Sequence, residues 1–235
     1  MRPVDRGSRP SDSDGKPVTF RNYQEAKPYL EGRLGEYCSY CERRQEASLA
    51  VEHIQPKSLH PELVLEWENF LLACSVCNSV KGDKDVILED YLWPHKDNTS
   101  RAFLYRESGI IEISPDLSES RQRFARNTLK LVGLQKQFRS RNHLKRRDKR
   151  WIKREKAWRK ASEASEILGK VDTREVRRLI LQNALSEGYW SIWMEVFKND
   201  AGMCRELIEA FSGTCHKCFD EEGKPVPRQD KSVEE

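Results

Sequence analysis

The sequence lacks any long apolar run, and no stretch approaches the roughly 20 consecutive apolar residues that a membrane-spanning helix needs. It also lacks an apolar segment near its start, where residues 1–15 are polar. A secretory signal peptide requires such a segment. We therefore expect neither membrane insertion nor secretion, and a cytoplasmic location follows by default.

Acidic residues are nearly absent from residues 121–160, although the whole chain carries a net charge of only +4. This stretch holds 17 Lys and Arg against two acids, Asp148 and Glu155. The remaining residues hold 25 basic and 36 acidic side chains, so an otherwise acidic chain carries one strongly basic segment. Such a segment suits a polyphosphate backbone, because each phosphate that it neutralises releases counterions.

Aromatic residues lie among the positive charges of this basic segment, at Trp151 and Trp158. Cations interleaved with aromatic rings favour nucleic-acid binding. Two other interpretations remain open, a solvated helix face and a patch that docks an acidic partner. The residues that we predict to bind nucleic acid here are Arg146, Arg147, Lys153 and Arg154.

A disulfide framework is not expected, because the seven cysteines are odd in number and we place the chain in a reducing compartment. Two Cys-x-x-Cys pairs, Cys38 with Cys41 and Cys74 with Cys77, are separated by 32 residues. Each pair can grip one ion from a tight turn, and four sulfurs complete a closed tetrahedral site that favours structural zinc. Redox-active or merely buried cysteine pairs are the alternative.

The cysteines near the C-terminus form a less complete set. They lack a second pair of the same quality, so a turn with free thiols is the favoured interpretation and a second zinc site the alternative. The residues concerned are Cys204, Cys215, His216 and Cys218.

An ordered set of polar residues lies inside or beside the zinc-bounded loop: Glu52-His53 followed by Ile54-Gln55-Pro56-Lys57-Ser58, then Asn69, then Asn78 directly after Cys77. Here the chain resembles the HNH nucleases. The resemblance implies a ββα-metal fold in which His53 ends a strand and Asn78 lies on the helix. Two departures stand out, since Glu52 replaces the commoner Asp and Asn78 replaces the third His.

Hydrolysis of a phosphodiester needs an activated water, charge neutralisation and hard oxygen ligands. A neutral His53 can take the proton from water, and Asn69 can orient its imidazole or backbone. Glu52 and Asn78 can hold Mg²⁺ or Mn²⁺. Taken singly, His53 also fits a core histidine, Asn69 a turn residue, Asn78 a helix cap and Glu52 a surface acid. The residues predicted to hold flanking phosphates are Lys57 and Lys81.

The resemblance extends beyond the nuclease motif to Met1-Arg2-Pro3-Val4, to residues 34–42 and to Trp67-Glu68-Asn69-Phe70. Over residues 1–100 the chain is similar to the HNH subunits of Septu-type anti-phage systems, some of which are linked to retrons. The resemblance implies a defence endonuclease that is restrained until infection is sensed. We expect DNA as the first candidate substrate and RNA as the second. The resemblance also implies an ABC-type ATPase partner (PtuA-like), with a retron reverse transcriptase and its RNA–DNA as further candidates.

Two other functions remain open: a non-catalytic zinc module that binds nucleic acid, and a stand-alone restriction-type nuclease. His95 is a lesser candidate for substrate contact, for which a surface position is favoured. His60 and His143 are interpreted as structural or exposed.

Apolar periodicity and breakers predict short strands at residues 50–54 and 67–73 and a helix from Cys77 or Asn78. A long basic helix is predicted over residues 134–161, and Thr173 is expected to cap a following helix that ends near Gly188. The predicted fold is α+β and mostly α, with a ββα-metal (HNH) core, a four-cysteine zinc site and a helical C-terminal region. Its predicted parts are an N-terminal arm and helix (1–35), the nuclease domain (36–115), a basic helical region (116–218) and a disordered tail (219–235).

Overall fold

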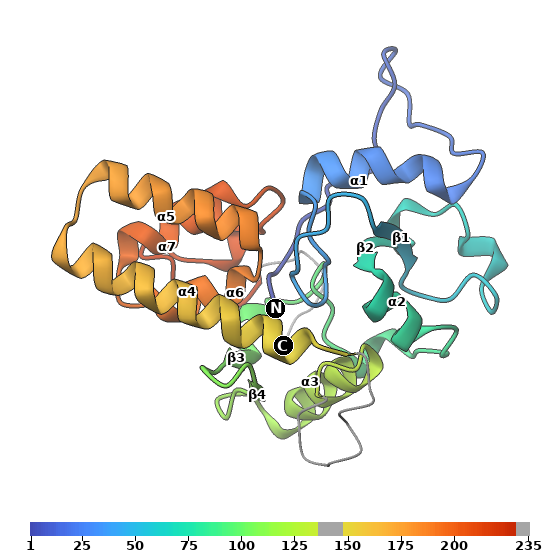
Figure 1. Cartoon of the computed structure of the whole chain (residues 1–235). Coiled ribbons are helices and arrows are strands. Elements are labelled where there is room, and N and C mark those ends of the chain that lie inside the picture. Colours follow the sequence, from blue (N-terminus) through green and yellow to red (C-terminus); the bar gives the residue numbers. More distant parts are fainter. Residues whose placement is uncertain (136–147, 229–235) are drawn as a thin grey trace.

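The computed structural model describes residues 1–135 and 148–228 (Figure 1). Arg146, Arg147 and His143, on which the sequence analysis made predictions, lie outside the described residues. No helix within the described ranges is long and apolar enough to cross a membrane.

The N-terminal arm leads into a short 3-10 helix, η1 (Tyr23–Ala26), and then α1 (Lys27–Leu34). Asn22 caps η1, because its side chain accepts a hydrogen bond from the amide of Gln24. Pro28 lies in the first turn of α1, where no helical partner for a backbone N–H is required. The chain therefore passes from η1 into α1 at this point, and Pro28 breaks no helical hydrogen bond.

The predicted strand–strand–helix unit is formed by β1 (Leu49–His53), β2 (Phe70–Cys74) and α2 (Ser75–Lys81). The two strands are antiparallel, and His53 lies opposite Phe70 in their register. Strand β2 is buried throughout, and α2 follows it directly. The connection between the strands contains η2 (Pro61–Leu63) and η3 (Trp67–Asn69). Because β1 ends at His53, that residue lies at the edge of the hairpin beside this connection.

The middle of the chain is more regular than its sequence predicts. After η4 (Leu88–Asp90) and η5 (Thr99–Arg101), β3 (Phe103–Tyr105) pairs with β4 (Ile111–Ile113) in a second antiparallel ribbon. Helix α3 (Glu119–Leu131) follows, and the hydroxyl of Ser118 caps its first turn. Strands of only three residues carry too little alternation to be predicted from the sequence.

Four helices complete the chain: α4 (Arg150–Lys170), α5 (Arg174–Glu187), α6 (Trp190–Val196) and α7 (Ala201–Ala210). Figure 1 shows them gathered on the opposite side of the molecule from α1, β1 and β2. Thr173 and Gly188 bound α5, as the sequence predicts. Helix α4 begins at Arg150 and runs beyond the predicted end at residue 161.

The N-terminal arm ties the two sides together. The buried guanidinium of Arg2 donates to the carbonyl of Leu34 at 2.7 Å and to that of Ser212 at 2.8 Å. Val4 pairs with Thr214 through an isolated β-bridge. One apolar core runs through both sides, from Leu30 and Phe70 to Trp190 and Trp193.

The predicted disorder after residue 218 is wrong for residues 219–228. This segment turns back on itself, with a bridge between Phe219 and Pro225 and a hydrogen bond of 2.9 Å from the amide of Val226 to the carbonyl of Cys218. Asn98 holds it by donating through Nδ2 to the carbonyl of Cys218 and to the carbonyl of Val226, each at 2.6 Å. Tertiary hydrogen bonds therefore order this segment, although its polar composition predicts disorder.

Candidate active site and zinc centre

The four cysteines of the two Cys-x-x-Cys pairs meet in one buried cluster. Their sulfur atoms all lie within 4.8 Å of one another, and the sulfurs of Cys41 and Cys74 are 3.7 Å apart. A zinc–sulfur bond of about 2.3 Å implies a tetrahedral edge of roughly 3.8 Å. The cluster therefore fits a zinc ion, which these residues would hold with no open position: Cys38, Cys41, Cys74 and Cys77.

Hydrogen bonds attach the first cysteine pair to the strand that carries the second pair. The amide of Ser39 donates to the carbonyl of Leu72 in β2 at 2.8 Å, and the amide of Cys38 donates to the carbonyl of Arg43 at 3.0 Å. Glu42 closes the turn with a left-handed backbone at φ 62°. The turn that carries Cys38 and Cys41 is thus held against the backbone of strand β2.

Residues of the C-terminal helices contact the zinc-site residue Cys77 and also Glu42, which follows Cys41. The guanidinium of Arg150, in the first turn of α4, donates to the sulfur of Cys77 at 3.0 Å. The buried carboxylate of Glu42 accepts from the amide and the hydroxyl of Ser191 in α6, at 3.0 and 2.6 Å. A four-thiolate zinc site carries net negative charge, so Arg150 is placed to offset it.

His53 is held at the end of β1 by contacts on two sides. Its Nε2 lies 3.1 Å from the carbonyl oxygen of Val64, and its ring packs edge-on against Tyr23 and Phe70, with ring centroids 4.9 and 5.2 Å away. A proton on Nε2 satisfies that carbonyl and leaves Nδ1 as the basic nitrogen. Burial lowers the pKa of His53, and nearby Lys57 and Lys81 lower it further against the opposing effect of Val64.

Asn69 holds the connection that follows His53. Its Oδ1 accepts from the amide of Gln55 at 2.8 Å, and its Nδ2 donates to the carbonyls of Gln55 and Leu63 at 3.0 and 3.3 Å. All of these partners are backbone groups, so Asn69 fixes the path of the chain from His53 toward Val64. That path in turn sets the carbonyl that His53 faces.

Glu52 and Lys81 form a buried ion pair behind His53. Their side chains are 3% and 1% exposed, and the Nζ of Lys81 lies 2.9 Å from Oε1 of Glu52. The same ammonium donates to the backbone carbonyl of His53 at 2.7 Å. Burial raises the pKa of Glu52, while the charge of Lys81 opposes that rise. Lys81, predicted to hold a flanking phosphate, is instead buried and engaged within the protein.

Asn78 lies on α2, three residues before Lys81 and next to Cys77. It is half-buried, unlike its fully enclosed neighbour Cys77. Carboxylate and amide oxygens are suited to Mg²⁺ or Mn²⁺. The pair Glu52 and Asn78 therefore fits a hard divalent cation in donor chemistry, with Lys81 as a competing positive charge at Glu52.

The predicted nucleic-acid residues occupy different environments. Lys57 is exposed, and its Nζ lies 4.2 Å from the ring centroid of Tyr23 and 3.2 Å from the Tyr23 hydroxyl. Lys153 is exposed on α4. Arg154, in contrast, is 2% exposed and donates through Nε to the carbonyl of Gly109 at 2.7 Å. Its guanidinium therefore faces the β3–β4 turn and does not reach the surface.

Neither the C-terminal cysteines nor His95 joins a metal cluster. Within residues 1–135 and 148–228, only the four zinc-site cysteines bring three or more metal-binding side chains together. Cys204 donates through its thiol to the carbonyl of Phe197 at 3.2 Å. The Nδ1 of His95 is buried without a hydrogen-bond partner, and burial lowers the pKa of His95 well below its usual value. His95 is therefore a neutral, partly buried residue rather than a surface histidine.

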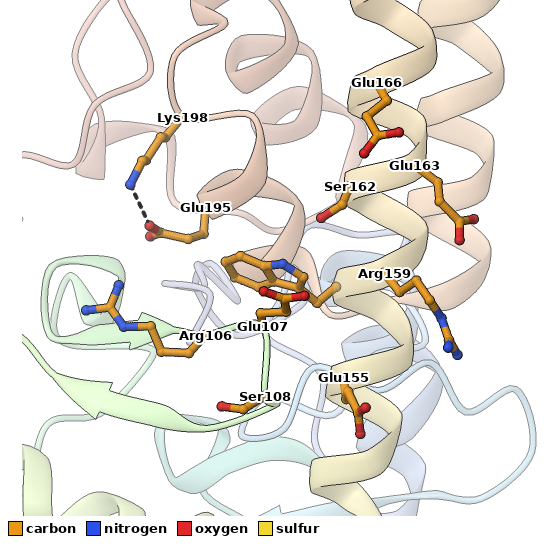
Figure 2. Close-up of a pocket in the computed structure, with 11 residues that line it drawn as sticks. Arg106, Glu107, Ser108, Glu155, Arg159, Ser162, Glu163, Glu166, Glu195 and Lys198 are labelled. Atoms are coloured by element: carbon orange, nitrogen blue, oxygen red, sulfur yellow. Dashed lines mark hydrogen bonds and ion pairs between the residues drawn. The ribbon is translucent and has the colours of Figure 1, made fainter.

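A large open cavity lies away from His53, between the β3–β4 turn and α4 (Figure 2). It has a volume of about 1020 Å³, and Trp158 lines it together with polar residues. Five of its lining side chains are acidic and three are basic, and Lys198 and Glu195 pair with each other at 2.9 Å. An excess of carboxylates disfavours a phosphate backbone, so this cavity is not the predicted nuclease site.

Two features of the His53 site were missed from the sequence. Tyr23 lies in a segment for which the sequence predicts only an arm and a helix, and the carbonyl of Val64 carries no side-chain signal. Both reach His53 through tertiary packing, Tyr23 from η1 and Val64 from the connection between β1 and β2. Their contribution could have been found only from tertiary structure.

Comparison with known protein families identifies the strand–strand–helix unit. Residues 38–84 match the HNH endonuclease family. The chain thus carries an HNH endonuclease domain, a nuclease fold whose members use divalent metals, and the predicted fold class is confirmed.

A known protein is similar to part of the chain. The chain is 38% identical over 81 residues to Septu protein PtuB from Bacillus thuringiensis. The match covers 32% of this chain and 32% of that relative. The predicted resemblance to the HNH subunits of Septu systems is therefore confirmed for about a third of each chain.

Proposed function

We propose that this protein is a metal-dependent endonuclease that hydrolyses phosphodiester bonds of DNA, with RNA as a second substrate. The observation that carries the proposal is the setting of His53. One imidazole nitrogen is engaged by the carbonyl of Val64 at 3.1 Å, so the other is the proton acceptor, and the lowered pKa keeps the ring neutral near pH 7. A neutral, oriented imidazole is what a general base for water requires.

The remaining residues of the site have supporting roles in this proposal. Asn69 is a positioning residue, because it fixes the chain between His53 and Val64. Glu52 and Asn78 would hold a divalent cation, and Lys57 would meet a flanking phosphate. When bound, the cation supplies Lewis-acid stabilisation of the phosphate and of the leaving oxygen. Until then Lys81 pairs with the buried carboxylate of Glu52 at 2.9 Å and opposes the rise in its pKa that burial causes.

We further propose that the protein is the nuclease subunit of a bacterial anti-phage system of the Septu type. The similarity to PtuB supports this assignment. It also supports a PtuA-like ABC-type ATPase as the partner, with the C-terminal helices as the docking surface. A retron reverse transcriptase and its RNA–DNA are further proposed partners. We propose that the complex works in the cytoplasm.

The buried pair of Glu52 and Lys81 favours one other function, a zinc module that binds nucleic acid without cutting it. If Lys81 neutralises Glu52 permanently, the site lacks its carboxylate ligand. The two functions differ in what His53 does, because only a nuclease needs its imidazole.

The test is a cleavage assay with labelled duplex DNA, single-stranded DNA and tRNA, in Mg²⁺ and in Mn²⁺, with and without the ATPase. We expect cleavage by the unmutated protein and a loss of about 10²–10⁴-fold in His53→Ala, with binding nearly unchanged. His60→Ala is the matched control, because His60 faces Glu62 and Asp85 at 3.4 and 3.5 Å instead of the hairpin. Undiminished cutting by His53→Ala would remove His53 as the base, and binding without cutting in every arm would establish the zinc module.

A further inference from the structure

Tyr23 joins two residues of the proposed nuclease site. On one side its ring meets the His53 ring edge-on, with centroids 4.9 Å apart. On the other side the ammonium of Lys57 lies over the same ring, 4.2 Å from its centroid and 3.2 Å from its hydroxyl oxygen. The three side chains therefore form one stack, His53–Tyr23–Lys57, which runs from a buried imidazole to an exposed ammonium.

The stack depends on a segment outside the HNH domain. Tyr23 belongs to η1, whereas the family match covers residues 38–84. Its position is fixed by the elements around it, since Asn22 caps η1 and the neighbouring Ala26 is fully buried. Helix η1 packs directly on β1, the strand that ends at His53. The N-terminal arm thus adds a side wall to the nuclease site.

A lysine side chain without a fixed partner samples many rotamers, and ordering it on a substrate costs entropy. Attraction to an aromatic face restricts that freedom. Because Lys57 lies four residues after His53, a held ammonium remains close to the base. A substrate phosphate that approaches His53 would therefore meet a cation that is already in place.

We propose that Tyr23 is a positioning residue of the nuclease site, which braces the His53 imidazole and holds the Lys57 ammonium ready for a phosphate of the nucleic-acid substrate. This inference rests on the proposed nuclease function. It assigns to the N-terminal arm a part in substrate binding and in the rate of cleavage.

Cleavage kinetics separate the two contributions of Tyr23. Lys57→Met removes a phosphate contact and should raise KM several-fold with kcat little changed. Tyr23→Ala frees both neighbours, so KM should rise as far as in Lys57→Met and kcat should also fall about 10-fold. Tyr23→Phe keeps the ring and should restore kcat fully and KM in large part. Tyr29→Ala is the matched control, because Tyr29 is 39% exposed on α1 and its ring contacts Phe20.

A binding experiment in the His53→Ala background tests the pair without any cleavage. The dissociation constant of labelled duplex DNA is measured by anisotropy at several salt concentrations. Lys57→Met should weaken binding and reduce the salt slope by about one phosphate contact. Adding Tyr23→Ala to Lys57→Met should weaken binding little further, because the two residues act as a unit.

The outcomes distinguish this inference from the function beneath it. Independent, multiplying effects of Tyr23→Ala and Lys57→Met on binding would overturn it, as would unchanged kcat and KM in a folded Tyr23→Ala protein. If Tyr23→Ala fails to fold, a loss of kcat of about 10-fold in Tyr23→Phe, which keeps the ring, would overturn the role of the ring. If the protein with His53 intact cuts no substrate, the nuclease proposal is refuted, and coupled binding effects would still support the pair of Tyr23 and Lys57.

Discussion

The zinc-framed region, residues 38–84, and the four helices from Arg150 to Ala210 use their charged residues differently. In the zinc-framed region the spacing of ligands and motif residues predicts where side chains meet, because four sulfurs on one ion permit few backbone paths. In the helical region the prediction of binding residues rested on net charge, which does not determine where each side chain lies. Arg150 and Arg154 belong to that basic segment, yet both are buried and donate to interior acceptors. Ligand spacing thus predicts contacts, whereas charge density predicts only an average surface.

The largest expected effect that sharpens this comparison comes from removing zinc. A structural zinc site contributes about 10–16 kcal/mol of binding free energy, comparable with the whole stability of a domain of about 5–15 kcal/mol. Chelation, or Cys74→Ser, should therefore unfold residues 38–84, while α4–α7 keep much of their helicity because these helices pack on one another. Circular dichroism and thermal melting, with zinc content measured in parallel, check this. Cys204→Ser is the control, because Cys204 is a buried cysteine outside the cluster.

If the metal-free protein melts at the holo temperature, the four cysteines do not frame the fold. If α4–α7 unfold together with the zinc-framed region, the stability of both regions depends on zinc. The contacts of Arg150 with Cys77 and of Ser191 with Glu42 would then make the molecule one cooperative unit.

The next effect concerns Lys81. Lys81→Met leaves the buried carboxylate of Glu52 without its counter-charge, and removing one partner of a buried ion pair costs about 3–5 kcal/mol. The melting temperature without added divalent cation should fall accordingly. If Glu52 is a metal ligand, Mn²⁺ should raise the melting temperature of Lys81→Met more than that of the unmutated protein.

The double variant Glu52→Gln, Lys81→Met is the control for that experiment. It removes both charges, so it should recover part of the lost stability and should lose the additional response to Mn²⁺. An equal response to Mn²⁺ in all three proteins would show that Glu52 takes no part in binding the cation.

The fold of the zinc-framed region, the meeting of its four cysteines and the place of His53 at the end of β1 were predictable, because they follow from spacing along the chain. The roles of Lys81 and Arg154 were not predictable, since the sequence gives their charge but not their burial. Tyr23 and Val64 escaped for a different reason: they reach His53 from separate segments. The ordered segment after Cys218 depends on Asn98, which precedes it by more than a hundred residues.

A smaller effect compares the two buried arginines of α4. Arg150→Met removes the donor to the sulfur of Cys77, and loss of such an outer partner typically weakens metal binding about 10–100-fold. Zinc transfer to a chromogenic chelator should therefore be at least about 10-fold faster. Arg154→Met should lower the melting temperature, because the carbonyl of Gly109 loses its donor, but should leave zinc release unchanged. Equal release rates in both variants would break the assignment of Arg150 to the zinc centre.

The smallest effect tests what remains of the predicted nucleic-acid surface. Lys149, Lys153, Lys156 and Lys160 recur at helical spacing and are exposed, so they form one stripe along the start of α4. If this stripe follows a duplex backbone, Lys153→Ala and Lys156→Ala should each reduce the slope of log binding constant against log salt by about 0.9. Lys198→Ala is the control, because that ammonium pairs with Glu195 beside the acidic cavity. A slope that changes no more than in the control would show that the exposed lysines, like the buried arginines, do not form a nucleic-acid surface, and would leave an acidic protein partner as their explanation.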